Sequence, residues 1–178
     1  LTGSAIVHFA MLLHDELMGP QRRVRSMRQH IVICGFGRHG RLVAEALLER
    51  AAREKLPLPL MAVVDRGEHG KNMLEVGSEG ASLLVPVIRG DVRDRHVLEA
   101  AGVTRASHVF VTCNDDVVNL GTALHVKSIG AVRATALVAD VELTEHLVGL
   151  AKSKDVSILN VYEVAARNLV AELRAKGQ

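Results

Sequence analysis

Aromatic residues are scarce in this sequence of 178 residues: three Phe and one Tyr make up 2% of it, and Trp is absent. Surfaces that bind single-stranded nucleic acid by base stacking need several exposed aromatic rings, so the composition argues against that class of protein. An excess of charge of one sign is also missing, because the formal net charge is +2. The sequence lacks the strongly basic character of nucleic-acid-binding domains, and we expect no nucleic-acid partner.

Cysteine is limited to Cys34 and Cys113, which excludes a disulfide-rich scaffold. The nine histidines are scattered along the chain. None of them stands with Cys or Glu at the spacing of a zinc site, so we expect no metal-binding centre.

Hydrophobic runs long enough to cross a bilayer are absent as well. A helical span needs about 20 apolar residues, and the apolar stretch 1–13 is shorter and has no basic region before it, as a secretory signal would. Four arginines follow within residues 22–28. The pattern fits either the cytoplasmic end of a membrane helix with a basic linker, or an amphipathic helix packed on its own domain. We divide the chain into residues 1–28, this helix and linker, and residues 29–178, a single domain.

Small and branched apolar side chains are abundant. Hydrophobic residues make up 48% of the sequence, and with so few aromatics the core must consist of Val, Leu, Ala and Ile, as in parallel strands covered by helices. Strand and helix patterns alternate along the chain. Strands are expected over 30–34, 60–65, 87–89, 106–112, 134–140 and 157–161. Helices are expected over 38–54, 71–76, about 91–102, 117–128, after 140, and from 161 onward.

This alternation predicts an α/β fold. We expect a Rossmann-like, doubly wound sheet of six mainly parallel strands with helices on both faces, preceded by an N-terminal helix. The last helix would either cover the core or form a dimer surface. Ligands of such a sheet bind at the carboxyl ends of its strands.

A glycine-rich turn joins the first strand to the first long helix. Residues 31–40 read Ile-Val-Ile-Cys-Gly-Phe-Gly-Arg-His-Gly, a Gly-x-Gly-x-x-Gly in a strand–turn–helix context. Gly35 would allow the tight turn, Gly37 the close approach of a pyrophosphate, and Gly40 the packing of helix on strand. The helix N-terminus would face the phosphates, with His39 either a phosphate contact or a solvated residue of the first turn. The alternative is a turn that packs in this way and binds nothing.

Asp65 ends the second expected strand, 25 residues after Gly40. In a dinucleotide fold an acid at this point binds the adenosine ribose hydroxyls, and it disfavours a 2′-phosphate, so NAD is preferred to NADP. The adjacent Arg66 weakens that preference. A solvated strand-end carboxylate, or a helix cap, is the alternative role for Asp65.

Further polar residues end the other strands. With the loop and Asp65 they complete the expected cofactor-binding set: Gly35, Phe36, Gly37, Arg38, His39, Gly40, Asp65, Arg66, Asp91, Thr112 and Asn114. Asn114 or Asp115 would alternatively cap the following helix. Cys34 and Cys113 lie at the same edge, either as buried thiols of a reducing compartment or as a redox-sensitive thiol beside the nucleotide.

The chain resembles the RCK (regulator of potassium conductance) family, also called Trk-type or KTN N-terminal nucleotide-binding domains. The resemblance covers about residues 28–175 and is carried by residues 31–40, 63–65, 90–91, 98–111 and 114–119. It implies a ligand sensor that binds NAD(H), or ATP, ADP or AMP, and forms a homodimer or a ring-like oligomer. It also implies a potassium-channel pore in the same chain or in a separate membrane subunit, at the cytoplasmic face of the cell membrane. On this reading residues 1–13 are the end of a pore helix.

Some members of this family bind calcium through acids after the fourth and fifth strands. Asp140 and Glu142 stand where such acids would lie, but Thr112 takes the place of a third, so calcium regulation is not expected. The family's C-terminal ligand-binding subdomain is not recognised in the sequence.

Two other functions are alternatives to the regulation of a potassium channel. A small NAD-dependent oxidoreductase would need a proton donor, but no Tyr-x-x-x-Lys is present and Tyr162 is the only tyrosine. We therefore do not expect an enzyme. The other is a structural dimerisation module with an empty cleft.

Overall fold

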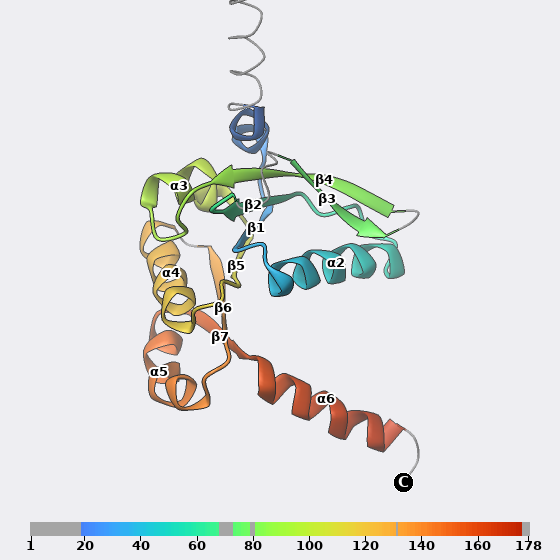
Figure 1. Ribbon diagram of the computed structural model, residues 1–178, viewed down its shortest axis with the longest axis vertical. Coiled ribbons are helices and arrows are strands. Elements are labelled where there is room, and N and C mark those ends of the chain that lie inside the picture. Colours follow the sequence, from blue (N-terminus) through green and yellow to red (C-terminus); the bar gives the residue numbers. More distant parts are fainter. Residues whose placement is uncertain (1–18, 68–72, 79–80, 131, 176–178) are drawn as a thin grey trace, which may run out of the picture.

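The computed structural model describes residues 19–67, 73–78, 81–130 and 132–175 (Figure 1). The described residues form a seven-stranded sheet in the order β3-β4-β2-β1-β5-β6-β7. All neighbouring strands pair in parallel except β3 and β4. The strands are β1 Ile31–Cys34, β2 Met61–Asp65, β3 Met73–Ser78, β4 Ala81–Arg89, β5 His108–Val111, β6 Arg133–Val138 and β7 Val156–Asn160.

Helices cover both faces of this sheet. Figure 1 shows α2 on one face and α3, α4 and α5 on the other. One hydrophobic core joins the sheet to α2, and a larger core joins its opposite face to α3, α4 and α5. The expected doubly wound α/β fold is therefore confirmed. The helices are α2 Arg38–Arg53, α3 Arg95–Ala100, α4 Asp116–Ile129, α5 Val141–Ser153 and α6 Val161–Ala175, with a 3₁₀ turn at Val103–Arg105.

The prediction of a helix over 71–76 is wrong for residues 73–76, because β3 occupies Met73–Ser78. Residues 71 and 72 lie outside the described ranges. Leu74 and Val76 are buried beside the exposed Glu75, so apolar side chains recur every second residue, as in a strand. Their partners lie on β4, in a hairpin whose apolar side packs with α2. The sheet therefore has seven strands and not six.

The third expected strand is also longer than predicted. Pro86 suggested a late start near Val87, but β4 begins at Ala81. Pairing with β2 starts at Val87, and Pro86 is the last β4 residue in the ladder with β3. The missing amide of proline is tolerated at such an end of a ladder.

The arginine-rich stretch is partly helical. Residues 19–26 form a helix, and the side chain of Val24 is fully buried in the larger core. Gln29 N donates to Arg105 O at 2.9 Å, and Arg105 Nη2 donates to Val24 O at 3.4 Å. The first part of the expected linker is thus held against the domain. The expected apolar helix over 1–13 lies outside the described residues, and no helix in the described ranges is long and apolar enough to cross a membrane.

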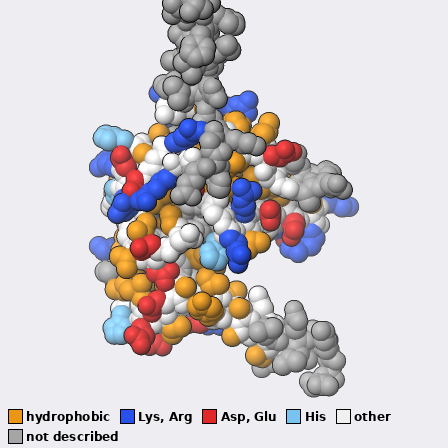
Figure 2. All heavy atoms as spheres, viewed as in Figure 1, with side chains coloured by type: hydrophobic (Ala, Val, Ile, Leu, Met, Phe, Trp, Pro, Cys, Tyr) orange, Lys and Arg blue, Asp and Glu red, His pale blue; other side chains and the backbone are white. Residues whose placement is uncertain are grey.

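The last helix, α6, extends away from the sheet (Figure 1). Figure 2 shows hydrophobic side chains gathered near the start of this helix. Leu159 on β7 is 43% exposed, and Tyr162 and Val170 on α6 are 65% and 52% exposed. At Tyr162 and Val170, therefore, α6 does not cover the core of its own domain and leaves an exposed apolar side.

Candidate functional site

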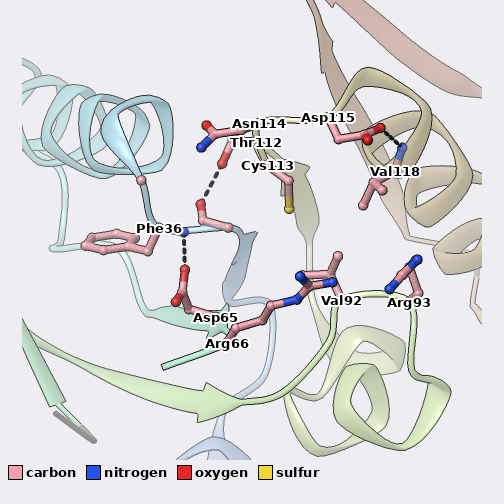
Figure 3. Close-up of a pocket in the computed structure, with 12 residues that line it drawn as sticks. Phe36, Asp65, Arg66, Val92, Arg93, Thr112, Cys113, Asn114, Asp115 and Val118 are labelled. Atoms are coloured by element: carbon pink, nitrogen blue, oxygen red, sulfur yellow. Dashed lines mark hydrogen bonds between the residues drawn. The ribbon is translucent and has the colours of Figure 1, made fainter. Parts of the chain in front are cut away.

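A pocket of about 480 Å³ opens at the carboxyl ends of the central strands (Figure 3). It lies where the strand order reverses, because β1 pairs with β2 on one side and β5 on the other. Such a switch point is the usual ligand site of open α/β sheets. The residues that line the pocket are Gly35, Phe36, Gly37, Asp65, Arg66, Val92, Arg93, Thr112, Cys113, Asn114, Asp115 and Val118.

Two glycines of the turn are required by geometry. Gly35 has φ +88°, and a Cβ there would lie 2.8 Å from Cys113 Sγ and 2.9 Å from Cys113 N. A Cβ on Gly40 would overlap Gly35 O and lie 3.1 Å from Thr112 Oγ1. The turn and α2 therefore pack directly against the loop after β5, which leaves no room for side chains at these positions.

Gly37 differs, because a Cβ there would meet nothing closer than Asn114 Oδ1, at 3.9 Å. Its missing side chain leaves space that the fold does not fill. Gly37 is also the N-cap of α2, and no side chain caps the amides of the first turn. Uncapped amides at a helix N-terminus bind phosphate or carboxylate oxygens.

Asp65 is tied to the glycine turn. Its Oδ2 accepts from Phe36 N at 2.8 Å, and its Oδ1 accepts from Gly67 N at 3.0 Å. A carboxylate has about four acceptor sites, so these two bonds leave others for hydroxyl donors of a ligand. Figure 3 shows the carboxylate beside the turn and the Phe36 ring directed away from the pocket.

A second carboxylate, Asp91, is occupied by arginines. Arg93 donates through Nε to Oδ1 at 3.0 Å and through Nη2 to Oδ2 at 2.6 Å, and its backbone N donates to Oδ1 at 2.9 Å. Arg66 Nη2 donates to Oδ2 at 2.9 Å. These hydrogen bonds, those of Arg93 first, hold the pKa of Asp91 well below its usual range. The carboxylate is therefore ionised at any physiological pH.

The loop after β5 forms the opposite wall. Thr112 Oγ1 donates to Gly35 O at 2.8 Å. Cys113, the residue after Thr112, is held by the buried side chain of Asn119: Asn119 Oδ1 accepts from Cys113 N at 2.8 Å, and Asn119 Nδ2 donates to Cys113 O at 2.9 Å. Asn119 Nδ2 also donates to Leu137 O at 2.8 Å. The loop is thus fixed to β1, α4 and β6.

The acids near this loop are used by the backbone. Asp115, not Asn114, caps α4 by accepting from Val118 N at 2.8 Å. Asp116 Oδ2 accepts from Ala139 N and Asp140 N, and Asp140 Oδ1 accepts from Leu143 N at 2.9 Å. Within the described ranges no cluster of three or more His, Cys, Asp or Glu residues could hold a metal ion.

Both thiols are poor nucleophiles at neutral pH. Burial raises the pKa of Cys113 to about 11, and burial also raises that of the fully enclosed Cys34. Because only the thiolate reacts readily, this chemistry favours the interpretation of unreactive thiols at the two strand ends over that of a redox sensor.

Most of the expected set converges on the pocket, namely Gly35, Phe36, Gly37, Asp65, Arg66, Thr112 and Asn114. Arg38 is exposed and His39 is half-buried, and neither lines the pocket, while Gly40 packs behind the turn. Asp91 is absent from the lining, and its carboxylate is bonded to Arg66 and Arg93, which do line the pocket.

Sequence reasoning missed some lining residues, which are Val92, Arg93, Asp115 and Val118. Arg93 could have been found from its place just after the strand-end pair Gly90-Asp91.

The sequence and the structure were compared with known protein families, curated proteins and solved structures, and the matches agree with one another. The model of the TrkA-N domain family matches residues 31–158. The Trk system potassium uptake protein TrkA of Azorhizobium caulinodans is 33% identical over 125 residues, which are 70% of this chain and 23% of that protein. The chloroplastic K(+) efflux antiporter 1 of Arabidopsis thaliana is 32% identical over 115 residues, or 61% of this chain and 8% of that protein. The chain thus spans less than a quarter of either relative.

Solved structures agree. The structure of GsuK bound to ADP is 26% identical, with a TM-score of 0.58, covering 93% of this chain and 37% of that one. The GsuK channel bound to NAD is 20% identical, with a TM-score of 0.57, covering 94% of this chain and 29% of that one. Since the family model matches residues 31–158, which are most of the sequence, the chain belongs to the TrkA-N family of RCK-type domains.

Proposed function

We propose that this chain is a regulatory domain of a potassium channel or transporter, and that it binds NAD(H) or an adenine nucleotide in the pocket at the glycine turn. The observation that carries the proposal is the meeting of an open Gly37, an uncapped helix N-terminus and Asp65 at one switch point. These are the parts that a dinucleotide site requires.

The pyrophosphate lies against Gly37 and the first amides of α2, where no side chain competes for them. Asp65 accepts from the ribose hydroxyls with its remaining lone pairs. Thr112 and Asn114 form the far wall, and Gly35 and Gly40 maintain the turn. Arg38, which is exposed, and His39, which is half-buried, stand at the start of α2 outside the pocket lining, so they reach only phosphate groups that extend out of the pocket.

NAD(H) is the preferred ligand, with ATP, ADP and AMP as alternatives. An acid at the end of β2 disfavours a 2′-phosphate. GsuK, a related channel, is described in structures with NAD and with ADP, which supports both classes of ligand.

Potassium transport is inferred from the relatives, which are a potassium uptake protein and a potassium efflux antiporter. The domain acts as a homodimer or larger ring, with the exposed side of α6 as an interface, at the cytoplasmic face of the membrane. Nucleotide favours one packing of the subunits, and the helix at 19–26 passes that preference to the pore. A ligand acts in this way only through different affinities for the two states.

Isothermal titration of the purified chain with NADH, NAD, ADP, ATP and AMP tests the ligand. Gly37→Asp should abolish binding without unfolding the domain, because its Cβ meets only one atom within 4 Å, while its charge repels phosphate. Gly121→Asp is the matched control, since a Cβ there meets nothing. Absence of binding by all five nucleotides at millimolar concentration would refute the proposal.

A further inference from the structure

Arg93 presents a fixed guanidinium plane at the β4 side of the pocket. Two side-chain bonds and one backbone bond join it to Asp91, with donor–acceptor distances of 3.0, 2.6 and 2.9 Å. Such a two-point contact sets the plane of the group as well as its position. The Arg93 side chain is nevertheless 60% exposed, so the plane is not covered by protein.

The order of the strands indicates which part of a nucleotide reaches Arg93. In the proposed nucleotide site the phosphates lie at the end of β1 and the ribose lies at Asp65 on β2, the strand that pairs with β1. The base follows the ribose, and the strand beyond β2 is β4. Val92 and Arg93, which follow β4, line the pocket at this point, and Val92 is only 6% exposed (Figure 3).

None of the described residues that line this part of the pocket offers an aromatic ring to stack on a base. Among the lining residues Phe36 alone is aromatic, and its side chain is fully buried in the core beside α2. Arg41 lies over its ring, with 5.3 Å from Cζ to the centroid. A planar, delocalised guanidinium is the other side chain that stacks well on an aromatic face.

We propose that Arg93 is the stacking platform for the adenine base, and that Asp91 is a positioning residue that holds its plane. The inference rests on the proposed nucleotide site and adds the group that recognises the base. It assigns to Asp91 a role through Arg93, in place of the direct ligand contact expected from the sequence. Arg66, the second donor to Asp91, keeps that carboxylate paired when Arg93 is replaced.

Calorimetric titration with ADP and UDP separates base from phosphate, because the two share the ribose and diphosphate. The wild type should bind ADP more tightly, since the purine stacks over a larger area. Arg93→Lys and Arg93→Ala should each weaken ADP binding about tenfold, the scale of one base stacked on a side chain, and UDP binding less. Asp91→Asn should likewise weaken ADP binding more than UDP binding, and so lower the ratio of the two affinities. Arg95→Ala is the control, because Arg95 is 62% exposed and pairs with Glu99.

Two results would overturn the assignment while leaving the nucleotide site intact. Retention of ADP affinity in Arg93→Lys would mean that charge and not the plane matters. Equal losses for ADP and UDP would place Arg93 on the sugar or phosphates. Failure of the wild type to bind either nucleotide would instead remove the proposed function and this inference together. Unchanged melting temperatures without nucleotide would confirm that the variants are folded.

Discussion

The carboxylate of Asp65 accepts the backbone N–H of Phe36 at 2.8 Å, so the end of β2 is bonded to the glycine turn that follows β1. The residue expected to bind a ribose also shapes the phosphate loop. A nucleotide that forms hydrogen bonds with Asp65 therefore contacts the carboxylate that holds Phe36, the residue before Gly37, in place.

Asp65→Asn should weaken NADH binding about tenfold or more, because hydrogen bonds to a charged group contribute roughly 1.5–3 kcal/mol. The same change should reduce the preference of the protein for NADH over NADPH, since the charge that repels a 2′-phosphate is removed. Titration calorimetry with both cofactors measures this. Asp94→Asn is the control: it removes one charge from the N-cap of α3, where asparagine caps equally well. Equal losses in both variants would indicate a general charge effect.

Gly40→Ala should lower the free energy of unfolding by about 1–3 kcal/mol, the usual cost of overpacking a filled site. Its Cβ would overlap Gly35 O, a backbone atom that cannot move without opening the turn. Gly121→Ala, on the exposed side of α4, should instead stabilise the protein by up to about 1 kcal/mol, because alanine is the better helix former. Urea denaturation of both variants gives the comparison. A stable Gly40→Ala protein would mean that α2 does not pack this closely.

Cys113 should react slowly with iodoacetamide at pH 8. With a pKa of about 11 in place of 9.0, the thiolate fraction is about 100-fold lower, and the rate should rise with pH until about 11. NADH should slow the reaction further if the nucleotide fills the pocket. Mass spectrometry of the intact protein follows the modification, with Cys113→Ser as the unlabelled control. Rapid labelling at pH 7 would restore the interpretation of a redox-sensitive thiol.

Val170→Glu should shift the chain towards smaller oligomers, because a charge would be placed on the exposed apolar side of α6, where Val170 is 52% exposed. Light scattering coupled to gel filtration measures the mass. Leu42→Glu on α2, at a position 55% exposed, is the control and should leave the mass unchanged. If Val170→Glu matches the wild type at every concentration, α6 is not the proposed interface.

Local patterns predicted the elements that depend on neighbouring residues. The β-formers before Gly35, the helical period after it and the acid at Asp65 are short-range signals, and each stands where it was expected. The stretch at Met73–Ser78 was assigned to the wrong class, because six residues are too few to separate a helical from a strand period. Its partner strand and the apolar side of α2 decide the conformation.

Short-range signals were enough to predict a Rossmann-type fold and the glycine turn, because steric limits at Gly35 and the alternation of apolar residues act over a few positions. Which polar groups meet could not be predicted in this way, because it depends on contacts between distant parts of the chain. The side chain of Asn119 is hydrogen-bonded to the backbone N and O of Cys113 and to the backbone O of Leu137. Arg93 is hydrogen-bonded to the carboxylate of Asp91, which the sequence had suggested as a ligand contact. Pairing of this kind depends on the distance and direction between separate strand ends, which are set only when the whole sheet and its helices pack.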